Sequence, residues 1–131
     1  MTVVDASAIT ELLLATTAGA RVAERLHRDR GQVHAPDLVD IEVLSALRRL
    51  EQRRDVPEHR ADEAVRDLSI LRIIRHRLGA LVDRAWELRH NCTVQDAMYL
   101  ALAEGLDATV VTCDARLGRA PGHAARVELI R

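Results

Sequence analysis

Four acidic residues are candidates for chemistry because of where they fall along the chain. Asp5 ends a short apolar run at the N-terminus, and Asp114 follows a second apolar run near the C-terminus. Asp96 opens the helical pattern that feeds this second run, and Glu42 lies in another helical pattern with apolar neighbours on both sides. Carboxylates placed at the ends of elements in this way are able to meet when the chain folds.

A cluster of carboxylates needs a compensating charge. Two carboxylates about 4 Å apart repel each other by about 4 kcal/mol at an effective dielectric constant of about 20. A cation, a shared proton or an arginine relieves this repulsion. Oxygen-only ligands, with no His or Cys at metal-ligand spacing, favour Mg²⁺ or Mn²⁺ over Zn²⁺. Such an ion orients a water molecule as nucleophile and stabilises the charged oxygens of a phosphodiester that is being cut.

The elements that must position these acids follow an alternating pattern. Short apolar runs separated by helical patterns are typical of a parallel sheet covered on both faces. We therefore predict an α/β fold with a central parallel sheet of four to five short strands, flanked by about seven helices. Predicted strands lie at residues 2–4, 32–35, 72–77 and 126–130 and within 93–117; predicted helices lie at 6–15, 20–30, 37–53, 57–71 and 79–90, and on both sides of the strand in 93–117.

Glycine, proline and the spacing of apolar residues predict the limits of several helices. Gly31 is predicted to end the second helix, and Pro36 to start the third. The helix over residues 57–71 is predicted to bury one apolar side, which consists of Ala61, Ala64, Val65, Leu68 and Leu71.

Strand direction predicts where the acids meet. In a parallel sheet, a helix that precedes a strand begins at the sheet's carboxyl edge, where open α/β sheets bind ligands. Asp5 and Asp114 lie at strand ends, and Asp96 lies in the first turn of such a helix. Glu42 lies near the start of another helix of this kind, and its apolar neighbours indicate that its side chain points inward. We expect all four carboxylates to converge at this edge.

Composition excludes several classes of protein. The 131 residues suit one domain over residues 1–131, and a formal net charge of −1 indicates neither a DNA-coating nor a membrane-surface protein. All nineteen basic residues counted as Lys+Arg are Arg, which excludes a P-loop and a Schiff-base lysine. The two cysteines form no CxxC motif, and neither a leader peptide nor a long apolar run is present. These features predict a reduced, cytoplasmic protein with no membrane segment.

Each acid also has an ordinary structural explanation. Asp5 and Asp114 precede helices and suit N-caps, while Thr93 and Asp96 match a capping box. Glu42 has no capping role, but a single glutamate in a helix is commonly exposed to solvent. A catalytically silent interaction module, in which the acids serve as caps, is therefore an alternative to an enzyme.

Taken together, these segments resemble a known family. The chain contains VVDAS at its start, a helix carrying Glu42, the stretch TVQDAMYLALAEGLDATVVTCDARL, and PGHAARVEL near its end. This combination resembles PIN-domain proteins, and specifically the VapC toxins of bacterial type II toxin–antitoxin systems, over nearly the whole chain. An acid at each of four places in the right order, followed by the TCD turn, makes the resemblance specific.

The resemblance implies a PIN fold and an endoribonuclease that depends on Mg²⁺ or Mn²⁺. By motif position, Asp5, Glu42, Asp96 and Asp114 would bind the metal. Thr112 matches a small hydroxyl position before the last acid, and Ser7 lies in the DAS segment, so both would support the site. Arg116 stands where some relatives carry a further acid.

The family also suggests partners and a second enzymatic alternative. VapC-like proteins are typically homodimers that a cognate VapB-like antitoxin holds inactive, so we expect an RNA substrate, an antitoxin and a second copy of the chain as partners. A structure-specific DNA nuclease of the same fold is the alternative enzyme.

Overall fold

A five-stranded parallel sheet forms the centre of the computed structural model, which describes residues 1–30 and 32–131. The strand order is β3-β2-β1-β4-β5. The strands are β1 (Thr2–Val4), β2 (Val33–Pro36), β3 (Ile74–His76), β4 (Thr109–Thr112) and β5 (Arg126–Leu129). The helices are α1 (Ala6–Leu13), α2 (Thr17–Arg28), α3 (Val39–Gln52), α4 (Glu58–Ile70), the 3₁₀ helix η1 (Leu78–Leu81), α5 (Val82–Glu87), α6 (Val94–Leu106) and α7 (Ala115–Arg119). The predicted α/β class is confirmed.

The strand order creates a crevice beside β1. The chain runs outward from β1 through β2 to β3, then crosses to the other side of β1 to form β4 and β5. At such a reversal, the connections after the two neighbouring strands leave in opposite directions, and a ligand crevice opens outside their carboxyl ends. The relevant ends here are Val4 and Thr112, which Asp5 and Cys113 follow directly.

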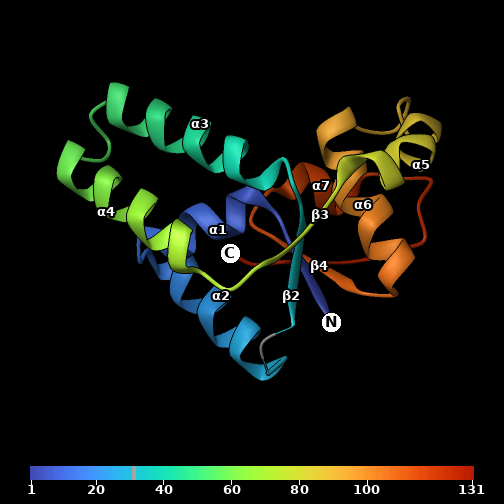
Figure 1. The fold of residues 1–131 in the computed structure, drawn as a ribbon, viewed down its shortest axis with the longest axis horizontal. Helices are drawn as coiled ribbons and strands as arrows, with labels where there is room; N and C mark the ends of the chain where they lie inside the picture. The colour runs from blue at the N-terminus through green and yellow to red at the C-terminus, as the bar shows by residue number, and fades with distance from the viewer. Residues whose placement is uncertain (31) are drawn as a thin grey trace.

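Helices cover both faces of the sheet (Figure 1). Side chains alternate along β1 and β4, so that Val3 and Val110 pack with α5, α6 and α7, while Val4 and Val111 pack with α1 to α4. All three residues of β1 are fully buried. Burial on both faces explains why this strand reads as a continuous apolar run rather than as an alternating pattern.

Several predicted boundaries are wrong, for local reasons. The helix α2 begins at Thr17 rather than at residue 20, because the Thr16 hydroxyl accepts a hydrogen bond from the Gly19 amide and caps the helix early. Pro36 ends β2 instead of starting a helix, and the next amide, of Asp37, donates to the carbonyl oxygen of His76 at 2.8 Å. The prediction for Gly31 lies outside the described residues.

Two further helix predictions need correction. The helix predicted over residues 79–90 is divided into η1 and α5 and ends at Glu87. In α4, Ala61, Ala64 and Leu68 are buried as predicted, but Val65 is 41% exposed.

None of the helices in residues 1–30 and 32–131 combines the length and apolar character needed to cross a lipid bilayer.

Close packing of α1 on α2 depends on Gly19. A Cβ atom at this position would lie 2.0 Å from the backbone oxygen of Glu11, whereas a Cβ at Gly105 of α6 would meet nothing within 4 Å. We expect Gly19→Ala to lower the free energy of unfolding by about 1–3 kcal/mol through overpacking. Gly105→Ala should raise it by roughly 0.5–1 kcal/mol, since alanine is the better helix former. Urea unfolding of both variants checks this, and equal effects would contradict the packing argument.

Candidate active site

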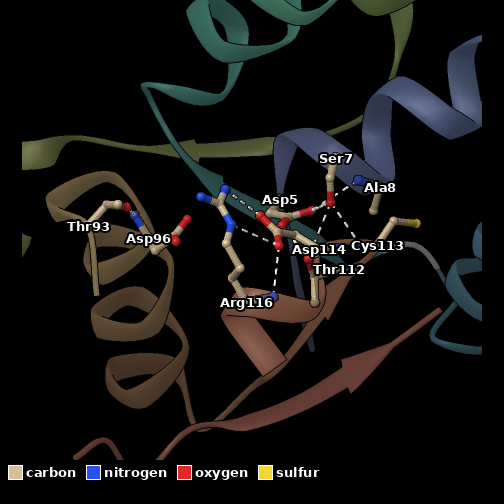
Figure 2. Close-up of polar contacts among 9 residues, drawn as sticks. All are labelled: Asp5, Ser7, Ala8, Thr93, Asp96, Thr112, Cys113, Asp114 and Arg116. Atoms are coloured by element: carbon tan, nitrogen blue, oxygen red, sulfur yellow. Dashed lines mark hydrogen bonds and ion pairs between the residues drawn. The ribbon is translucent and has the colours of Figure 1, made fainter. Parts of the chain in front are cut away.

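The four predicted acids line one cavity of about 660 Å³ at the carboxyl edge of the sheet. Asp5 lies between β1 and α1, Glu42 in the first turn of α3, Asp96 in the first turn of α6, and Asp114 immediately before α7. Figure 2 shows Asp5, Asp96 and Asp114 facing a common space, with the Arg116 side chain between Asp96 and Asp114. The predicted convergence is therefore observed, whereas a role in metal binding stays a prediction.

A larger cavity, of about 1140 Å³, lies elsewhere in the fold, and it is bordered by α1, α2 and α4. It shares no lining residue with the acidic cavity, and its only acidic lining residue is Asp67. We therefore place the candidate site in the smaller cavity, because that is where the acids converge.

Asp5 is the most buried of the four acids, with 6% of its surface exposed. The amide of Ala8 donates to Oδ1 at 3.0 Å, so Asp5 caps α1 as an N-cap would. The hydroxyl of Ser7 also donates to Oδ1, at 2.7 Å, and the hydroxyl of Thr112 donates to Oδ2. Burial raises the pKa of Asp5 despite these hydrogen bonds, and the negative charge of Asp96 raises it further.

The two predicted supporting residues join the strand ends. Besides its bond to Asp5, the Ser7 hydroxyl accepts a hydrogen bond from the amide of Cys113 at 2.9 Å. The Thr112 hydroxyl accepts one from the amide of Asp114, also at 2.9 Å. These contacts tie the segment after β1 to the segment after β4, so the crevice walls are held in a fixed relation.

Glu42 points into the cavity and is half-buried. The hydroxyl of Tyr99 donates to Glu42 Oε1 at 2.6 Å. Burial raises the pKa of Glu42, the hydrogen bond from Tyr99 opposes this, and the negative charges of Asp96 and Asp5 add to the rise. The alternative of a solvent-facing glutamate is therefore wrong for this residue.

Asp96 and Asp114 face opposite electrostatic conditions. Burial raises the pKa of Asp96, and the charge of Asp114 adds to this. The guanidinium of Arg116 donates to both carboxylate oxygens of Asp114, with Nη2 at 2.9 Å from Oδ2, and thereby lowers the pKa of Asp114. Asp114 also caps α7 by accepting from the Arg116 amide, and Thr93 caps α6 by accepting from the Asp96 amide. Capping and a place in the cavity thus coexist.

The sequence reasoning missed two residues that contact the acids. Tyr99 is one helical turn beyond Asp96 and therefore lies on the same side of α6, which was a usable signal. Arg116 was noted by its position, but its pairing with Asp114 was not predicted. Arg49 of α3 also lines the cavity.

The donors in the cavity suit a hard divalent cation. All four acids offer oxygen, and no histidine lines the cavity. Cys113 is the one soft donor there, but burial first, and the charge of Asp5 next, raise its pKa to about 11, so it remains a neutral thiol at neutral pH. In residues 1–30 and 32–131, no three His, Cys, Asp or Glu side chains are already gathered closely enough to hold an ion.

Comparison with known proteins agrees with the fold. The PIN domain family model matches residues 2–122. Ribonuclease VapC12 of Mycobacterium tuberculosis is 44% identical over 131 residues, which covers 99% of each chain. The crystal structure of M. tuberculosis VapC20, described as a Sarcin-Ricin loop cleaving toxin, superposes with a TM-score of 0.65 at 20% identity, covering 90% of this chain and 93% of that one.

A third similar structure is VapBC2 from Rickettsia felis, bound to a DNA fragment from its promoter. It superposes with a TM-score of 0.68 at 14% identity and covers 99% of this chain and 98% of that one. At sequence identities of 14–20%, the superpositions support only the shared fold. The match to the PIN family model and the 44% identity to VapC12 show membership of the family. The chain therefore belongs to the VapC family of PIN-domain proteins.

Proposed function

We propose that this protein is a Mg²⁺- or Mn²⁺-dependent endoribonuclease and the toxin of a VapBC-type toxin–antitoxin system. The observation that carries the proposal is the convergence of Asp5, Glu42, Asp96 and Asp114 in one cavity. Burial first, and the negative charge of neighbouring acids in addition, raises the pKa of Asp5, Glu42 and Asp96, and a bound cation would relieve the repulsion between these charges. The ribonuclease name of the relative VapC12, at 44% identity, supports RNA as the substrate.

The four acids would hold the cation, which supplies an activated water and stabilises the charged phosphate oxygens when it is bound. Asp5 is held in place by hydrogen bonds from Ser7 and Thr112, and its cap on α1 fixes the direction of its carboxylate. Glu42 is held by Tyr99. Fixed carboxylates of this kind lose little freedom when a ligand binds, which favours binding.

Arginines at the cavity supply the contacts that an anionic substrate needs. Arg116 and Arg49 are the arginines among the cavity's lining residues, and the Arg116 side chain is 74% exposed. A guanidinium binds a phosphate through two parallel hydrogen bonds. Arg116 reaches the substrate by exchanging the carboxylate of Asp114 for a phosphate group of RNA.

The proposal extends to partners and location. We propose a cognate VapB-like antitoxin, a homodimeric assembly, and a place in the cytoplasm, where RNA substrates are found. Exposed apolar side chains offer contact surface for partners; Ile70 is 78% exposed, Ile41 is 62% exposed and Trp86 is 61% exposed. The structural similarity to VapBC2 also supports an antitoxin partner.

A cleavage assay on two substrates tests the function. The purified protein should cut single-stranded RNA when Mg²⁺ or Mn²⁺ is present, lose this activity in EDTA and regain it when the metal is restored. Flap DNA, assayed in parallel, should remain intact. Cleavage of flap DNA with intact RNA would favour the structure-specific DNA nuclease. No cleavage of either, together with no calorimetric signal on Mn²⁺ titration, would favour the silent interaction module.

A further inference from the structure

Tyr99, the single tyrosine of the chain, is almost fully buried, yet its hydroxyl contacts a cavity acid. Only 1% of its surface is exposed, and its ring belongs to the core beneath α5 and α6. The hydroxyl donates to Glu42 Oε1 at 2.6 Å. The two residues are 57 positions apart, on α6 and α3, so the contact links two of the helices that border the cavity.

A buried tyrosine hydroxyl requires a partner, because leaving it unpaired forfeits a hydrogen bond with water. Burial raises the pKa of Tyr99, and the contact with Glu42 raises it further, so the phenol stays protonated and acts as a donor. The partner oxygen of Glu42 is thereby fixed. In the part of the chain that the structure describes, Glu42 Oε2 has no hydrogen bond, which leaves this second oxygen for the cavity.

We propose that Tyr99 is a positioning residue, which holds one carboxylate oxygen of Glu42 so that the other faces the cation and the substrate. This inference rests on the proposed function. Glutamate has three rotatable side-chain bonds, and fixing them on binding is unfavourable in entropy. A donor that fixes the carboxylate beforehand removes part of this loss, as partners behind metal ligands do elsewhere.

The arrangement also gives α6 two tasks. Asp96 and Tyr99 are three residues apart, so they lie on the same side of the helix, one turn apart. Asp96 enters the cavity directly, whereas Tyr99 acts on it through Glu42. A phenylalanine at position 99 would fill the same core volume and would lack only the hydroxyl group that donates to Glu42.

The test compares Tyr99→Phe with a matched variant, Thr2→Val. Thr2 is fully buried, and its hydroxyl donates to a carboxylate, that of Asp29, outside the acidic cavity. Both variants therefore delete one buried hydroxyl that serves a carboxylate. Mn²⁺ affinity is measured by calorimetry, and unfolding of the metal-free proteins by urea.

We expect Tyr99→Phe to weaken Mn²⁺ binding by about 10- to 100-fold, the effect typical of losing a partner behind a metal ligand. Thr2→Val should leave the affinity within about twofold of wild type, since distant sites act independently. In a Glu42→Ala background, Tyr99→Phe should have no further effect on Mn²⁺ affinity. In metal-free urea unfolding, the Tyr99 and Glu42 variants should be non-additive, which requires no metal at all.

The outcomes separate the two proposals. If wild type binds Mn²⁺ and Glu42→Ala weakens the binding, but Tyr99→Phe binds as wild type does, the positioning role is wrong and the proposed function stands. Additive effects of Tyr99→Phe and Glu42→Ala in metal-free unfolding would likewise overturn it. If wild type binds no Mn²⁺, the metal-dependent function fails, while non-additive unfolding would still place Tyr99 behind Glu42.

Discussion

Asp5→Asn should abolish RNA cleavage while leaving the protein folded. The substitution removes the charge of the most buried acid in the cavity but keeps Oδ1, so the cap on α1 is retained. Loss of a metal ligand should exceed the roughly 10- to 100-fold effect of losing a partner behind one, so we expect the cleavage rate to fall by more than about 100-fold. Single-turnover cleavage of a labelled RNA at saturating Mn²⁺ measures this, and growth arrest on expression should disappear in parallel.

Asp40→Asn provides the control for this substitution. Asp40 lies on α3 two residues before Glu42, pairs with Arg75 through contacts of 2.7 and 2.8 Å, and does not line the acidic cavity. The chemical change is the same, but it lies outside the cavity. Cleavage by this variant should therefore match that of wild type. Full activity in folded Asp5→Asn protein would refute the assignment of Asp5 as a metal ligand.

Without metal, the cavity acids should make the protein less stable as pH rises. Asp5, Glu42 and Asp96 have raised pKa values in the folded protein, mainly through burial, relative to ordinary values of 3.8, 4.5 and 3.8. The folded protein therefore binds protons at these groups more tightly than the unfolded chain does. The resulting contribution to the free energy of unfolding is present at low pH and is lost as pH rises from about 4 through the raised pKa values. Asp114 and Glu104 have lowered pKa values, so their opposite contribution changes only at lower pH.

Urea unfolding across pH in EDTA measures this effect, with Asp5→Asn as the comparison. The variant lacks one of the three titrating groups. Its free energy of unfolding should therefore fall less than that of wild type as pH rises above about 4. At neutral pH, Mn²⁺ should reverse the loss in wild type and add about 2.7 kcal/mol at 100 times its dissociation constant. A constant difference between the two proteins across pH, or equal stabilisation of both by Mn²⁺, would contradict this account.

Strand ends were predictable from sequence because they depend on local patterns. Apolar runs that end in an acid located Asp5 and Asp114, and strand direction then placed both at one edge of the sheet. The inward direction of Glu42 was predicted from its apolar neighbours, but of these only Val43 is buried, whereas Ile41 is 62% and Leu44 41% exposed, so the direction was right and the reason holds only for Val43. These inferences required only periodicity and the geometry of parallel sheets.

The remaining features depend on which side chains meet after folding. The early start of α2 results from the Thr16 hydroxyl, and a threonine at such a place competes with several other possible caps. The contacts of Tyr99 with Glu42 and of Arg116 with Asp114 depend on rotamers and on the packing of α6 and α7. Pattern reasoning assigns elements and faces, but it does not choose partners among the polar groups that reach one cavity.

Each of the four converging acids either lies in residues 93–117 or is held by a residue from them. This stretch contains Asp96 and Asp114, its Tyr99 holds Glu42, and its Thr112 holds Asp5. The order of synthesis gives this arrangement a consequence, because these residues leave the ribosome after Asp5 and Glu42. A nascent chain that ends before them has Asp5 and Glu42 without their partners and lacks the other two acids. A nuclease built in this way would have no complete site until synthesis has passed Asp114.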